Sequence, residues 1–148
     1  MNIIFLDIDG VLVNSNQKYK RMLDHGDHQH RQLDPSCVAA LNKITDRTRA
    51  VFVMSSSWRF GYDDAVAYLK SQGVTGGFLG RTAPIDQDTR GLEIQDWLRD
   101  HSYYGDKRFI IIDDDADMGE LKSRLVQPDR KVGLTDADAD AAIKLLKE

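Results

Sequence analysis

The chain of 148 residues has very little cysteine and no long hydrophobic run. The single Cys37 cannot form an internal disulfide, which argues against a cross-linked secreted scaffold and leaves a buried thiol as the expectation. The longest apolar stretches, around Ala50–Met54 and Phe109–Ile112, are as long as strands, whereas a membrane-spanning helix needs about 20 residues. No basic and apolar leader precedes Ile3. We therefore expect a cytoplasmic protein without a membrane segment.

An excess of positive charge is also missing, since the formal net charge is -4. This charge disfavours non-specific binding along a nucleic-acid backbone, although it is compatible with a local basic pocket. A content of 41% hydrophobic and 30% charged residues is that of an ordinary globular protein. The chain length is close to the usual size of one domain, so we expect a single domain over residues 1–148.

Short apolar runs alternate with helical patterns along the sequence. We predict strands at Asn2–Leu6, Ala50–Met54, Gly77–Leu79, Arg108–Ile112 and Lys131–Leu134. Helices are predicted at 35–47 after an Asp34 cap, at 63–72, at 91–99, and after a Thr135 cap. The polar stretch 13–33 is expected to be mainly loop. This alternation predicts an α/β fold whose mostly parallel sheet is covered on both faces, with a site at the carboxyl ends of the strands.

Acidic residues follow two of the predicted strands. Asp7 and Asp9 come directly after the first strand, and Gly10 permits a sharp turn behind them. Asp113 and Asp114 come directly after the fourth strand. Because such crowded carboxylates repel one another unless a cation lies among them, they indicate a metal site. Oxygen ligands without a Cys/His set favour Mg²⁺ over zinc.

Residues that can bind phosphate oxygens lie after the second predicted strand and at the start of a predicted helix. Ser55 and Ser56 follow the second strand, where hydroxyls and backbone N–H groups suit a phosphate, and Arg59 is close behind. Arg90 opens the helix before the fourth strand, where its charge can balance the acids and clamp a phosphoryl group. We expect these four residues to bind the substrate phosphate. Trp58 is expected to pack rather than to stack on a base.

Three stretches resemble the motifs of the haloacid dehalogenase-like (HAD) superfamily. FLDIDGVL resembles the first motif, VFVMSS the second and IIIDDD the fourth. The resemblance implies that Asp7 is the nucleophile, Asp9 the acid–base, Ser55 a phosphate ligand, and Asp113 and Asp114 metal-binding acids. The third motif normally carries Lys, and Arg90 occupies the matching place. The implied fold is a Rossmann-like three-layer sandwich with a sheet in the order 5-4-1-2-3.

A wider resemblance covers most of the chain. SSSWR, RG-x-EI-x-x-WL and LVQPDRKVGLTDADADAAIKLL are similar to the small HAD domains grouped with Swiss Army Knife RNA-repair proteins. This resemblance implies a Mg²⁺-dependent phosphomonoester hydrolase that works through an aspartyl-phosphate. Asp7, the backbone carbonyl of Asp9, and Asp113 or Asp114 would hold the metal. The alternatives are a receiver-like signalling domain, a catalytically silent phosphate-binding module and an acid-cluster nuclease.

Neither of the two intervals where HAD enzymes carry a cap domain has room for one. Residues 13–33 are polar and lack an apolar face, and residues 59–90 are used by one helix and a short strand. We therefore expect a minimal cap or none, and an open site. Such a site suits a phosphate on a large carrier, and the resemblance favours a nucleic-acid end. Basic residues of the first interval are a candidate contact surface, with plain solvation as the alternative: Lys18, Lys20, Arg21, His28, His30 and Arg31.

Overall fold

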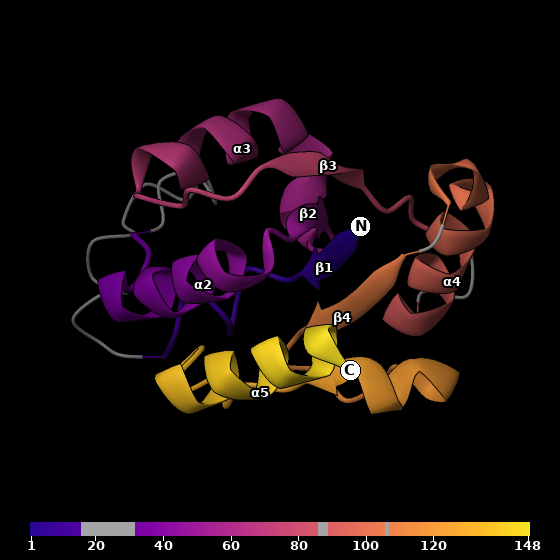
Figure 1. Ribbon diagram of the computed structural model, residues 1–148. Coiled ribbons are helices and arrows are strands. Elements are labelled where there is room, and N and C mark those ends of the chain that lie inside the picture. The colour runs from indigo at the N-terminus through magenta and orange to yellow at the C-terminus, as the bar shows by residue number, and fades with distance from the viewer. Residues whose placement is uncertain (16–31, 86–88, 106) are drawn as a thin grey trace.

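The strands of the computed structural model, which describes residues 1–15, 32–85, 89–105 and 107–148, lie side by side in one parallel sheet (Figure 1). They are β1 (Asn2–Leu6), β2 (Val51–Met54), β3 (Phe78–Arg81), β4 (Arg108–Ile112) and β5 (Leu125–Val126). Their order is β3-β2-β1-β4-β5. Counted from the opposite edge, this is the predicted order 5-4-1-2-3, so the predicted α/β fold class is confirmed.

Helices cover both faces of this sheet. The longer ones are α2 (Pro35–Thr48), α3 (Tyr62–Ser71), α4 (Arg90–Asp100) and α5 (Asp136–Lys147), and three short 3₁₀ turns are η3 (Ser57–Gly61), η4 (Ser102–Tyr104) and η5 (Gly119–Arg124). Figure 1 shows α2 and α5 on one side of the sheet and α4 on the other. The four helices correspond to the four predicted from the apolar periodicity.

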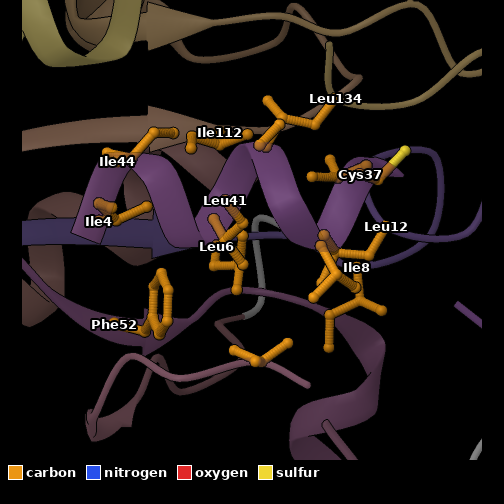
Figure 2. Packing of buried hydrophobic residues seen from close by; sticks show 14 of the residues in the cluster. Ile4, Leu6, Ile8, Leu12, Cys37, Leu41, Ile44, Phe52, Ile112 and Leu134 are labelled. Atoms are coloured by element: carbon orange, nitrogen blue, oxygen red, sulfur yellow. The ribbon is translucent and has the colours of Figure 1, made fainter. Parts of the chain in front are cut away.

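The side chains of β1 alternate between two hydrophobic clusters. Ile4 and Leu6 join the cluster under α2 and α5, and Figure 2 shows Leu41 of α2 among the buried side chains there. Phe5 belongs to the cluster under α4, where its ring meets Trp97 edge-on with centroids 5.5 Å apart. A strand buried on both faces reads as a continuous apolar run, which is why NIIFL was recognisable in the sequence. Packing on both faces thus holds β1 at the centre of the sheet.

Two predicted caps begin helices in the structure. The Asp34 side chain accepts a hydrogen bond from the backbone N–H of Ser36 at the start of α2. Thr135 and Asp138 form a reciprocal capping box at the start of α5, with both bonds close to 3 Å. Each such cap satisfies N–H groups that a helix leaves unpaired, and is typically worth about 1 kcal/mol.

The fifth strand is not where the sequence analysis placed it. The prediction of Lys131–Leu134 is wrong, because β5 is Leu125–Val126 and pairs with Ile111 and Ile112 of β4. Residues 129–133 instead form a turn in which Gly133 has φ +79°, and the N–H of Gly133 donates to the carbonyl of Asp129 at 2.7 Å. The apolar residues of that stretch therefore lie in and after a tight turn. Residues 127–130 form the segment that directly follows β5.

In the described part of the chain, no helix combines the length and the apolar character needed to cross a membrane. The predicted contact surface between Lys18 and Arg31 lies outside the described residues. Between β2 and α4, the described residues form only η3, α3, β3 and short connections. In the part that is described, this interval therefore contains no insertion of the size of a cap domain.

Candidate active site

Asp7 is the first residue after β1, and the sheet holds its backbone in place. Its N–H donates to the carbonyl of Ile112 at 3.0 Å, which continues the pairing of β1 with β4 by one step. The side chain is only 6% exposed. Three residues later the chain turns away through Gly10, which has φ +82°, a conformation that residues with a Cβ rarely adopt. This turn brings Asp9 and the next residues over the end of the sheet.

Three carboxylates from the ends of β1 and β4 converge beside this turn. Asp7, Asp113 and Asp114 each offer one oxygen, and these oxygens lie within 4.8 Å of one another. Because β1 and β4 are neighbours in register, residues just after both strands reach the same point. The backbone N–H of Asp115 donates to Asp113 Oδ1 at 2.9 Å and helps to fix that carboxylate. The structure thus brings together three of the four acids predicted to form the metal site, while the carboxylate of Asp9 is not part of this cluster.

This convergence has an electrostatic cost. Burial, followed by the charge of Asp113, raises the pKa of Asp7 to about 9, while Arg90 opposes the shift. Burial also raises the pKa of Asp113 to about 6, again against the influence of Arg90. The cluster therefore resists full ionisation with the protein's own charges alone. A divalent cation among the oxygens would offset this repulsion, and a cluster of carboxylate oxygens suits Mg²⁺. The residues present fit such an ion.

Arg90 is the first residue of α4 and reaches into the acidic cluster. Its Nη1 lies 3.3 Å from Asp7 Oδ1 and 3.1 Å from Asp113 Oδ2, and it also donates to the backbone carbonyl of Ser55. The next residue of the helix, Gly91, packs directly against the backbone of Met118, and an added Cβ at this position would collide with it. A small residue at this position lets α4 approach closely enough for the arginine to reach both carboxylates.

Asp9 has a different environment from Asp7. Its carboxylate is partly exposed, and its Oδ2 accepts a hydrogen bond from the indole Nε1 of Trp58 at 3.0 Å. Trp58 is 3% exposed and lies in η3, far from Asp9 in sequence. Trp58 packs in the core as predicted, and its hydrogen bond to Asp9 is a feature that the sequence did not predict. A tryptophan next to serines carries no sequence signal of its bonding partner.

The serines after β2 have distinct environments. Ser55 is fully buried, and its Oγ has no hydrogen-bond partner among the described residues. Ser56 is also buried, and its side chain caps η3 by accepting from the N–H of Trp58 at 3.2 Å. Ser57 lines the pocket beside Asp7 and Asp9. Of the three serines, only Ser57 is among the described residues that line the pocket. The hydroxyl of Ser56 is engaged in the turn, while that of Ser55 lies behind the lining with unused bonding capacity.

The structure does not bring Arg59 to the acidic cluster. Its guanidinium is buried against Glu93 of α4, with Nη1–Oε1 3.1 Å and Nη2–Oε2 3.0 Å, and Nη1 also donates to Thr82 Oγ1 at 3.2 Å. The residue is absent from the described lining of the pocket. Arg59 was grouped with the phosphate ligands because of its position after SSSW, but its charge is matched by a buried glutamate instead. Arg59 is therefore not part of the proposed site.

A cavity of about 310 Å³ lies in front of the cluster and contains a residue that the sequence analysis did not find. Arg130, from the loop after β5, lines it and places Nε 3.4 Å from Asp114 Oδ2. The sequence could have indicated Arg130, because residues that follow a strand of a parallel sheet tend to reach the site. Misplacing the fifth strand at Lys131–Leu134 hid it. The other lining residues are Asp7, Asp9, Gly10, Val13, Asn14, Ser15, Ser57, Arg90 and Asp114.

Comparison with known proteins identifies a family for this arrangement. The model of the HAD domain in Swiss Army Knife RNA repair proteins matches residues 3–139. No curated protein and no solved structure gives a significant match to the chain. The matched span includes Ile3–Leu6 of β1, all of β4 and every described residue that lines the pocket.

Proposed function

The chain belongs to the family of HAD domains in Swiss Army Knife RNA repair proteins, and we propose that it is a Mg²⁺-dependent phosphomonoester hydrolase. HAD domains are in general hydrolases, many of them phosphatases. The observation that carries the proposal is the convergence of Asp7, Asp113 and Asp114 within 4.8 Å. Arg90 reaches this cluster, and Asp9 lines the same cavity. Such a set suits a reaction in which one carboxylate attacks phosphorus.

In the proposed reaction, Asp7 attacks the phosphoryl group in line with the leaving oxygen. The Mg²⁺ site would be formed by Asp7, the backbone carbonyl of Asp9, and Asp113 or Asp114, and a bound ion would neutralise the charge of the carboxylates and of the phosphate. As the bond from Asp7 to phosphorus forms, the ester P–O bond breaks, and Asp9 gives its proton to the leaving oxygen. Asp9 then takes a proton from the water that hydrolyses the aspartyl-phosphate, which regenerates Asp7.

The charged phosphoryl oxygens would be held by groups at the ends of β2 and α4. Arg90 supplies a guanidinium that already lies beside Asp7, at 3.3 Å. The buried Oγ of Ser55 lacks a partner among the described residues, and a buried hydroxyl without a hydrogen bond costs free energy. A phosphoryl oxygen at this strand end would remove that cost. Ser57 lines the cavity and can serve as a further donor.

We propose a large substrate that presents a terminal phosphate, with a nucleic-acid end as the leading candidate. The cavity volume of about 310 Å³ is at the lower end of small-molecule pockets, so it suits the phosphoryl end of a larger molecule. Arg130 lies at its rim with a side chain that is 68% exposed, in position to meet a second anionic group. The family name adds the association with RNA repair.

The activity is tested by measuring phosphate release from a phosphomonoester and from a phosphodiester, with Mg²⁺ and with EDTA. We expect Mg²⁺-dependent hydrolysis of the monoester and none of the diester. Hydrolysis of the diester alone would indicate an acid-cluster nuclease. Stable protein phosphorylation without turnover would indicate a receiver-like domain, and no reaction would indicate a silent binding module.

Substrate size is tested separately, by comparing kcat/KM for a mononucleotide and for an oligonucleotide that carries the same terminal phosphate. We expect the oligonucleotide to be preferred. A clear preference for the mononucleotide would contradict the large-substrate proposal while leaving the phosphomonoesterase proposal intact. Replacing Arg130 by Gln should reduce the preference for the longer substrate if this residue contacts a second phosphate.

A further inference from the structure

The indole ring of Trp58 is buried, yet its Nε1–H donates a hydrogen bond to Asp9, which lines the pocket. The Nε1–Oδ2 distance to Asp9 is 3.0 Å, and Trp58 is 3% exposed. Its ring also lies 6.2 Å from that of Tyr68 in α3. The tryptophan therefore joins the hydrophobic core at one side and the pocket at the other.

The backbone around Trp58 is fixed at the residues before and after it. The Ser56 side chain accepts from the Trp58 N–H at 3.2 Å, which sets the start of η3. The next residue, Arg59, is held by the buried Glu93 with two contacts near 3 Å. Because the turn is held at both sides, the indole cannot easily change direction. Its N–H is a fixed donor aimed at the loop after β1.

A fixed donor has a specific effect on an aspartate. The torsion at the end of an aspartate side chain is broad, so a lone carboxylate samples many orientations. The indole N–H can donate but never accept, and its contact with Oδ2 favours placing a transferable proton on Oδ1. Acid–base catalysis depends on the proton carrier being within hydrogen-bond reach of the reacting oxygen. Orientation of Asp9 is therefore a function that this contact can perform.

We propose that Trp58 is a positioning residue, whose indole N–H orients the carboxyl group of Asp9 for proton transfer to the leaving oxygen. This inference rests on the proposed phosphomonoesterase function, because it assigns Trp58 a part in that reaction. In this role Trp58 acts through Asp9 and not directly on the phosphoryl group. Its effect is confined to the group that protonates the departing alcohol.

The alternative is that Trp58 only fills space in the core, and the two roles differ in their dependence on the leaving group. A p-nitrophenolate departs readily without a proton, whereas an alkoxide needs one. A variant that mispositions Asp9 should therefore lose activity on benzyl phosphate and keep most of it on p-nitrophenyl phosphate. The ratio of kcat/KM for the two esters is the quantity to measure, because kcat/KM covers the step in which the leaving group departs.

Trp58→Phe removes the N–H and keeps an aromatic ring, and Trp97→Phe is the matched control. Trp97 is 5% exposed, packs against Phe5 in the other hydrophobic cluster, and is not among the described residues that line the pocket. General acid–base help contributes roughly 10²- to 10⁴-fold, so we expect Trp58→Phe to lower the benzyl to p-nitrophenyl ratio by at least about tenfold. Trp97→Phe should leave the ratio unchanged, even if it lowers thermal stability. Asp9→Asn should lower the ratio further.

Equal losses on both esters in Trp58→Phe would overturn the positioning role, and so would an unchanged ratio. A drop of the same size in Trp97→Phe would overturn it too, because the effect would then follow from lost packing. Failure of the proposed function looks different: Asp9→Asn would then leave the ratio unaltered, or wild-type protein would hydrolyse neither ester. Should Trp58→Phe fold poorly, Trp58→His takes its place, because its imidazole keeps an aromatic N–H donor. Its ratio should stay closer to the wild-type ratio than that of Asp9→Asn does, and a ratio as low as that of Asp9→Asn would contradict the positioning role.

Discussion

Arg59 and Glu93 form a two-point ion pair in the interior, with nitrogen–oxygen distances of 3.1 and 3.0 Å. The pair connects η3 to α4. These two elements supply Trp58, which contacts Asp9, and Arg90, which contacts Asp7. A contact outside the pocket therefore fixes the relative position of the two turns that surround the acids.

Replacing Glu93 by Gln should strongly destabilise the protein, because it leaves the buried guanidinium of Arg59 without a matching charge. Removing one partner of a buried pair typically costs about 3–5 kcal/mol. The measurement is the urea midpoint at equal m-value. Lys43→Gln is the control, since Lys43 pairs with Asp136 and Asp140 at the surface and should contribute little. Equal small effects of both substitutions would contradict the structural role of the buried pair.

Arg90 should matter for activity through its charge. Arg90→Met removes the cation that lies 3.3 Å from Asp7 and 3.1 Å from Asp113. Loss of one such electrostatic contact typically lowers the rate by about 10²- to 10³-fold. Arg90→Lys keeps the charge and should retain more of kcat/KM than Arg90→Met. If the methionine and lysine variants lose the same amount, then the position requires the planar guanidinium itself, and the view that charge suffices is wrong.

Gly10 should be required for metal binding. Its φ of +82° strains any residue with a side chain, and an added Cβ would collide with the carboxylate of Asp114. Gly10→Ala is therefore expected to weaken Mg²⁺ binding, measured by calorimetry on the folded protein. Gly77→Ala is the matched control, because an added Cβ there has nothing within 4 Å. Unchanged Mg²⁺ affinity in Gly10→Ala would mean that Asp114 is not a metal ligand.

Cys37 should react slowly with thiol reagents in the native protein. It is 1% exposed, and burial, followed by the charge of Asp34, raises the pKa of its thiol to about 11. Near pH 8, the labelling rate should be far higher in urea than in buffer. The shift also lowers stability in alkali: the protonated thiol favours the folded state below the unfolded pKa, and this contribution is lost as the pH rises toward about 11. Fast labelling of the native protein would contradict this assignment.

Much of this fold follows from local patterns, and the exceptions have physical causes. After their first residues, the strands NIIFL and RFIII are largely buried between the two helical layers, so these positions are all apolar and the acids that follow mark the strand ends. The caps Asp34 and Thr135 were predictable because capping uses side chains adjacent in sequence. The β5 strand has only two residues, too few for any periodicity, and its misplacement hid Arg130. The partners of Trp58 and Arg59 lie 49 and 34 residues away, a separation that one sequence does not encode visibly.

The central claim is that Asp7 carries the phosphoryl group during turnover, and the Asp9→Asn variant tests it most directly. With p-nitrophenyl phosphate and Mg²⁺, the first step needs no proton donor, while the second lacks its base, so a phosphorylated protein should accumulate. Rapid acid quenching followed by peptide mass spectrometry should show one added phosphoryl group on Asp7, and none when Asp7 is also changed to Asn. Release of p-nitrophenol by the Asp9→Asn variant without any phosphate on Asp7 would contradict the mechanism.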